Sequence, residues 1–199
     1  FNMKEHRKAA KRKIEEQKPL LLIGSPPCTP FCRLQHFSSE SKAKKDKLAE
    51  GVAHMKFMVE LYRMQIKAGR AFLHEQPAYA TSWALPEIKK MMREERVDVW
   101  QADQCMYGLK AWGLRRSLSV PAKKPTRFMT NSRAIGAELA RRCDGNLAHQ
   151  TLVDGRAKEA ARYLVELCRA IFRGFIQDKM EGRIGLRAMA EITSQQAQR

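Results

Sequence analysis

The sequence lacks the features that would place it in a membrane or in the secretory pathway. No apolar run approaches the ~20 residues that a helix needs to cross a bilayer. The amino end, residues 4–13, is densely charged where a secretory signal would be apolar. We therefore expect an intracellular protein, nuclear or cytoplasmic, with no membrane partner.

Closely spaced cysteines are scarce as well. The five cysteines are odd in number and widely spread, which indicates free thiols in a reducing compartment rather than a disulfide framework. Only Cys28 and Cys32 lie near each other, and no second close pair of cysteine or histidine completes a zinc pattern. We therefore expect no metal site. A thiol redox protein that uses Cys28 and Cys32 is a weaker alternative, because the chain has no Cys-x-x-Cys.

Acidic residues are few, 21 against 38 lysines and arginines, which gives a formal charge of +17. A surplus of this size on 199 residues favours a polyanionic partner, most simply nucleic acid. A basic surface that serves solubility or meets an acidic protein is the other interpretation. Hydrophobic residues make up 44 % of the chain, enough for one packed domain.

Helical and strand patterns alternate along the chain. Apolar spacing predicts helices over 3–17, 48–66, 87–95, 133–142 and 156–176, and strands over 20–23, 71–77, 97–105 and 126–130. We expect loops at 36–48 and 109–124. This alternation is typical of an α/β fold with a mainly parallel sheet, in which 20–23 is an interior strand. We assign 1–18 to a basic helix, 19–177 to the main domain and 178–199 to a C-terminal tail.

Two polar segments follow neighbouring strands of this predicted sheet. The run Leu20–Ile23 is followed by Gly-Ser-Pro-Pro and then Cys28, and the two prolines stiffen the loop that presents the thiol. The next strand ends in His-Glu75-Gln-Pro. Because ligands bind at the carboxyl ends of strands in open α/β sheets, we expect Cys28 and Glu75 to face a common cleft.

In these segments the chain resembles the DNA cytosine methyltransferases that modify carbon 5. That family carries Pro-Pro-Cys after one strand and Glu-Asn-Val or Glu-Asn-Pro after the next. Residues 105–108, Cys-Met-Tyr-Gly, and 124–131, Lys-Pro-Thr-Arg-Phe-Met-Thr-Asn, are similar to a segment of its phage-type members. Cys143-Asp-Gly with His149 is similar to a later turn of that group. The resemblance covers roughly residues 18–175 and implies a Rossmann-like methyltransferase core.

The resemblance also implies roles for individual residues. Cys28 would add as a thiolate to carbon 6 of cytosine, with a pKa lowered by electropositive surroundings. Glu75 would bind the base at N3, after the base has left the duplex. Other substrate contacts would come from Pro26, Pro27, Thr126, Arg127 and Asn131. Contacts to the DNA backbone would come from Arg115, Arg116, Lys123 and Lys124.

The implied methyl donor is S-adenosylmethionine. The family's Phe-x-Gly-x-Gly loop, which approaches this cofactor, precedes the cysteine strand, whereas residues 1–19 contain no glycine. We therefore expect a partial core, with the cofactor held mainly by sequence upstream of Phe1 in a longer polypeptide. The alternative is a degenerate, non-catalytic basic module that binds nucleic acid or serves as a subunit of a larger assembly.

Overall fold

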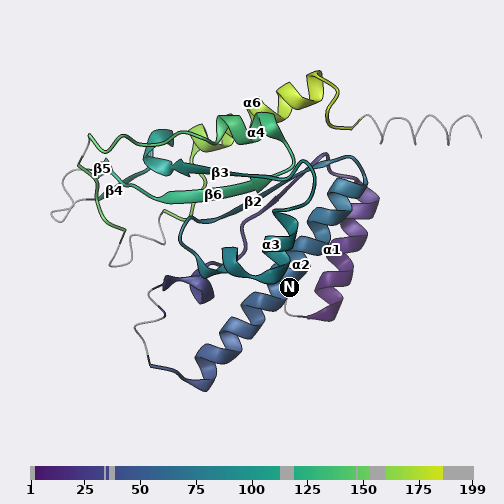
Figure 1. The fold of residues 1–199 in the computed structure, drawn as a ribbon, viewed down its shortest axis with the longest axis horizontal. Coiled ribbons are helices and arrows are strands. Elements are labelled where there is room, and N and C mark those ends of the chain that lie inside the picture. The colour runs from purple at the N-terminus through teal and green to yellow at the C-terminus, as the bar shows by residue number, and fades with distance from the viewer. Residues whose placement is uncertain are drawn as a thin grey trace, which may run out of the picture.

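A four-stranded sheet lies between two layers of helices in the computed structural model, which describes residues 3–33, 35, 39–112, 119–146, 148–152 and 160–185 (Figure 1). One face of the sheet is covered by α1 (Lys4–Gln17), α2 (Lys42–Lys67) and α3 (Pro86–Met91). The other face is covered by α4 (Arg133–Glu138) and α6 (Val165–Met180). The expected α/β class is confirmed. Within the described ranges, no helix is both long and apolar enough to span a bilayer.

The sheet has the order β1 (Leu21–Gly24), β2 (Ala71–Pro77), β6 (Pro125–Thr130) and β3 (Asp98–Asp103). β1 pairs in parallel with β2, whereas β6 is antiparallel to both β2 and β3. Three strands therefore run in one direction with β6 against them. The expectation of a mainly parallel sheet holds for strand direction but is wrong for the pairing, because β6 enters between β2 and β3.

β1 is an edge strand among the described residues, not the interior strand expected from its apolar run. It pairs only with β2, and Ile23 remains 42 % exposed. Its register with β2 places Gly24 opposite His74, so that both strands end at the same edge of the sheet. Gly24 is required there because a Cβ atom would lie 2.0 Å from the Tyr62 hydroxyl oxygen.

Two apolar clusters hold the layers together. The larger one joins α1, α2 and α3 to the sheet and includes Ile14, Tyr62 and Phe72. The second joins β2, β3 and β6 to α4 and α6. At its centre the two helices approach so closely that a Cβ on Gly174 would lie 2.5 Å from the Ile135 backbone nitrogen. The basic helix α1 is thus part of the packed fold through Ile14.

Several element boundaries differ from the expected ones. α2 begins at residue 42, six residues early, because the Ser41 hydroxyl accepts a hydrogen bond from the Lys44 N–H and caps the helix. Part of 109–124 forms a two-stranded sheet, β4 (Lys110–Trp112) with β5 (Ser119–Pro121). α6 starts at residue 165 rather than 156 and extends past the expected domain end at 177. Residues 186–199 of the expected tail lie outside the described residues.

Candidate functional site

The loop after β1 is fixed at several points. Cys28 precedes the short helix η1 (Thr29–Phe31), and its carbonyl accepts a hydrogen bond of 2.9 Å from the Phe31 N–H. The Phe31 side chain is buried in the α2 cluster. On the other side of the cysteine, the Pro26 carbonyl accepts a hydrogen bond from the Gln76 side-chain amide on β2. The half-buried Cys28 thiol is therefore held at the tip of β1, beside the end of β2.

Glu75 lies one residue past the last β1–β2 pair and points to the α6 side of the sheet, as Leu73 does. The residue is only 8 % exposed. Its Oε1 is buried and accepts no hydrogen bond from the described residues. The Lys124 Nζ lies 3.7 Å from that oxygen and donates a hydrogen bond of 3.1 Å to the Ala160 carbonyl. Lys124 is thus the counter-charge of a buried carboxylate.

Tyr163 completes this group of side chains, although its helical apolar surroundings in the sequence gave no signal for a site. Its hydroxyl lies 2.5 Å from the Ser25 hydroxyl oxygen. The charge of Glu75 acts on the Tyr163 hydroxyl and raises its pKa further than burial alone does. We call Ser25, Cys28, Glu75, Lys124 and Tyr163 the Cys28–Glu75 site.

The ionisable groups of this site influence one another. Burial raises the pKa of Glu75, and the Lys124 charge and a hydrogen bond from Ser25 oppose that rise. Burial also raises the pKa of the Cys28 thiol, the Glu75 charge raises it further, and the Lys124 charge opposes both. The expected lowering of the Cys28 pKa is therefore wrong for the free chain, because burial and the carboxylate outweigh the single lysine.

Three predicted substrate contacts lie elsewhere or are already engaged. The Asn131 amide bonds the backbone of Phe72 and Arg70, at the opposite end of β2 from Glu75. The buried Thr126 hydroxyl bonds the Gln104 side chain and the Lys124 carbonyl. Arg127 stands opposite Gln76 on β2, which places it on the other face of the sheet from Glu75. None of these three joins the Cys28–Glu75 site.

The predicted DNA-backbone residues also separate. Lys124 points toward Glu75 with its side chain 21 % exposed, an orientation that does not present its charge outward to a phosphate. Lys123, one residue earlier, is exposed. Arg115 and Arg116 lie outside the described residues.

His74, next to Glu75, belongs to the opposite layer. Its Nδ1 lies 2.9 Å from the Tyr62 hydroxyl, and its ring packs edge-on against Trp83. Complete burial lowers its pKa to about 3. The imidazole is therefore neutral and structural, and it carries no acid–base role at the site.

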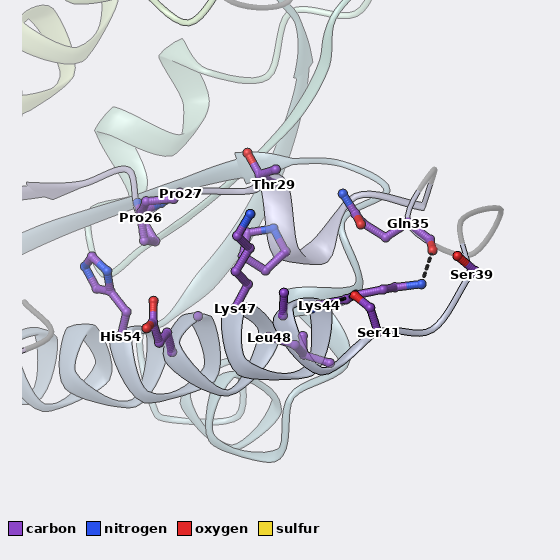
Figure 2. Close-up of a pocket in the computed structure, with 14 residues that line it drawn as sticks. Pro26, Pro27, Thr29, Gln35, Ser39, Ser41, Lys44, Lys47, Leu48 and His54 are labelled. Carbon is purple, nitrogen blue, oxygen red and sulfur yellow. Dashed lines mark hydrogen bonds between the residues drawn. The ribbon is translucent and has the colours of Figure 1, made fainter.

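A pocket of about 600 Å³ lies on the other side of the proline loop, between Pro26–Pro30 and the first half of α2. Figure 2 shows Lys47 and His54 rising from the helix toward this loop. Its size suits a nucleoside-sized molecule. Lys44, Lys47 and Glu50 line it, so its charged lining carries both signs and does not by itself select S-adenosylmethionine.

No family model matches the chain, and neither a curated protein nor a solved structure shows significant similarity to it. The arrangement of the site's own residues is therefore what supports a function.

Proposed function

We propose that this chain carries the catalytic-motif part of a DNA cytosine-5 methyltransferase. The observation that carries the proposal is the meeting of Cys28 and Glu75 at adjacent strand ends, with the buried Oε1 of Glu75 free of hydrogen bonds from the described residues. The Lys124 charge offsets the burial of this oxygen from 3.7 Å, but the oxygen accepts no hydrogen bond within the described part of the chain, and a ligand could supply that donor. The exocyclic amine and the N3 position of cytosine offer matching groups.

In the proposed reaction the Cys28 thiolate forms a bond to carbon 6 of the cytosine ring. The electron pair displaced from the 5,6 double bond moves toward N3, where the Glu75 carboxylic acid delivers a proton. Carbon 5 then has enamine character and accepts an electrophile. Loss of the carbon 5 proton to water, return of the N3 proton to the Glu75 carboxylate and expulsion of the Cys28 thiolate restore the aromatic ring.

The electrostatics of the site couple these two residues. The Glu75 pKa is raised by burial, which favours the protonated acid that the base requires. Protonation of Glu75 also removes the negative charge that raises the pKa of Cys28, leaving Lys124 as the nearby charge that lowers it. Docking of a base that keeps Glu75 protonated would therefore favour the thiolate.

The proposed substrate is a cytosine rotated out of the duplex. Glu75 is only 8 % exposed, so a base that stays stacked in the duplex could not reach it. Lys123, the exposed neighbour of Lys124 in the chain, is the proposed phosphate contact within the described residues. The net charge of +17 supports a polyanionic substrate.

The methyl donor belongs to the proposal through the family resemblance alone. S-adenosylmethionine would supply an electrophilic methyl group. The Rossmann-like core is proposed on the same basis. The open edge of β1, with Ile23 exposed, is where further strands of a larger sheet would add.

The addition step can be tested without a methyl donor. Reversible addition of Cys28 makes carbon 5 exchange its hydrogen with water, so DNA tritiated at carbon 5 of cytosine should release tritium when incubated with the full chain. Single-stranded and duplex DNA are compared, because the single strand needs no base flipping. Cys28→Ala should abolish release, and Glu75→Gln should reduce it by about 10²–10⁴-fold. Cys32→Ala, a thiol removed four residues along, should retain it.

The rival is a non-catalytic nucleic-acid-binding module, which the raised pKa of Cys28 favours. It predicts DNA binding without tritium release, and the same binding for Cys28→Ala as for the unaltered chain. That result would refute the enzyme proposal.

A further inference from the structure

A second cluster of side chains lies away from the Cys28–Glu75 site. Cys105 belongs to the short helix η4 (Gln104–Tyr107) after β3, whereas Cys143 and His149 lie on the loop that follows α4. One ligand atom from each of the three residues falls within 4.8 Å of the other two. Sequence spacing did not reveal this cluster, because Cys105 is remote from the other two residues in the chain.

The spacing within the cluster suits a tetrahedral metal ion. The Cys143 Sγ lies 3.4 Å from the His149 Nε2. Zinc bonds of about 2.3 Å to sulfur and about 2.0–2.1 Å to nitrogen place two such ligands about 3.6 Å apart at the tetrahedral angle. Hydrogen bonds of Cys143 to His149 and to Cys105 explain these contacts pair by pair, whereas one metal ion would explain the convergence of all three ligand atoms.

The donor set selects the kind of ion. Two thiolates and one imidazole are soft to borderline ligands, which favour Zn²⁺ over Mg²⁺ or Ca²⁺. We propose that Cys105, Cys143 and His149 bind a zinc ion that ties η4 to the loop after α4. A water molecule would complete the tetrahedral coordination.

Neighbouring hydrogen bonds hold the ligands in place. The buried Asp103 carboxylate accepts hydrogen bonds from the Cys143 N–H at 2.9 Å and from the Arg142 Nε at 3.0 Å. This carboxylate fixes the backbone that presents Cys143, as groups surrounding a metal site commonly do. Asp103 is thus a positioning residue and not a ligand.

The proposed zinc site also supports the segment that carries Lys124. The Gln104 N–H, one residue before Cys105, donates a hydrogen bond of 3.1 Å to the Lys124 carbonyl. The loop of His149 is joined to β5 by a hydrogen bond of 2.8 Å from the Gln150 N–H to the Pro121 carbonyl. A metal at this point would restrain both ends of 121–124. The inference concerns metal binding and does not depend on the proposed methyltransferase function.

The test measures metal in the full chain, without DNA or methyl donor. Protein purified under reducing conditions from zinc-supplemented cells should contain about one zinc per chain by mass spectrometry of the elements. After removal of zinc, titrated Co²⁺ should show thiolate charge-transfer and tetrahedral d–d absorption bands. Cys105→Ser, Cys143→Ser and His149→Asn should each lower the zinc content at least tenfold, whereas the control Cys168→Ser should keep it.

Three outcomes would overturn the proposal. The first is wild-type protein, folded by circular dichroism, that holds no zinc and gives no tetrahedral cobalt spectrum. The second is equal zinc loss in Cys168→Ser, which would indicate adventitious binding to thiols. The third is a Cys105–Cys143 disulfide in protein isolated from zinc-supplemented cells before any removal of metal, found by peptide mapping. The cobalt titration of the unaltered chain decides the matter even if a ligand variant fails to fold.

Discussion

Breaking the pair between Lys124 and Glu75 tests the arrangement of the Cys28–Glu75 site directly. Lys124→Met removes the charge and keeps most of the side chain's length. Two unit charges 3.7 Å apart attract by about 4.5 kcal/mol at an effective dielectric constant near 20. The Lys124 side chain is 21 % exposed. Water at this partly exposed side chain screens the attraction, so we expect about half of that energy, ~2 kcal/mol, as the loss of unfolding free energy at pH 8.

The loss should depend on pH. Burial raises the pKa of Glu75 above its ordinary value of 4.5, so the folded chain holds this proton to higher pH than the unfolded chain. The stability linked to the protonated acid is present below the ordinary pKa and is lost as pH rises through the folded value. Removal of Lys124 raises the folded pKa further, so Lys124→Met should cost less at pH 5 than at pH 8.

Urea unfolding followed by tryptophan fluorescence measures these differences. The double variant Lys124→Met with Glu75→Gln should recover most of the loss, with a coupling energy of about 2 kcal/mol in the mutant cycle. The hydrogen bond from Lys124 to the Ala160 carbonyl is lost in Lys124→Met and in the double variant alike, so its energy cancels in the mutant cycle. Lys123→Met, the exposed neighbour, should stay within about 0.5 kcal/mol of the unaltered chain. Equal losses of unfolding free energy in Lys124→Met and Lys123→Met would refute the reasoning. No recovery of stability in the double variant would refute it as well.

Two further outcomes follow from the same structure. Glu75→Gln should speed alkylation of Cys28 by iodoacetamide at pH 8, because the Glu75 charge raises the pKa of that thiol. Peptide mass spectrometry measures the rate, with Cys32 as the internal reference. An unchanged rate at Cys28 would contradict this electrostatic effect. Gly174→Ala should destabilise the fold by about 3 kcal/mol, since the new Cβ would lie 2.5 Å from the Ile135 backbone nitrogen and force α4 away from α6. A loss below about 0.5 kcal/mol in urea unfolding would show that the helices separate freely.

Local sequence patterns predicted most of the helices and strands. β2 has the bounds expected from residues 71–77, and α4 begins at residue 133 as expected. The adjacency of the two strand tips followed from the parallel pairing of β1 with β2. These features depend on neighbouring residues or on one strand pair, so sequence spacing is sufficient to predict them.

Side-chain roles at the end of β2 could not be predicted this way. Lys124 and Asn131 were expected to contact DNA and substrate, yet one neutralises Glu75 and the other bonds the start of β2. Both outcomes depend on the entry of β6 between β2 and β3, a pairing that joins distant segments. The contribution of Tyr163 likewise depends on how the segment before α6 packs over the sheet.

The sequence by itself determined the basic charge, the alternation of helices and strands, and the presence of a thiol and a carboxylate after successive strands. Only the tertiary structure decided the burial of Glu75, the opposing effects of Glu75 and Lys124 on Cys28, and the convergence of Cys105 with Cys143 and His149. The physical reason is that charge and periodicity are properties of a linear chain. Desolvation and ligand geometry arise only when segments distant in that chain are packed together.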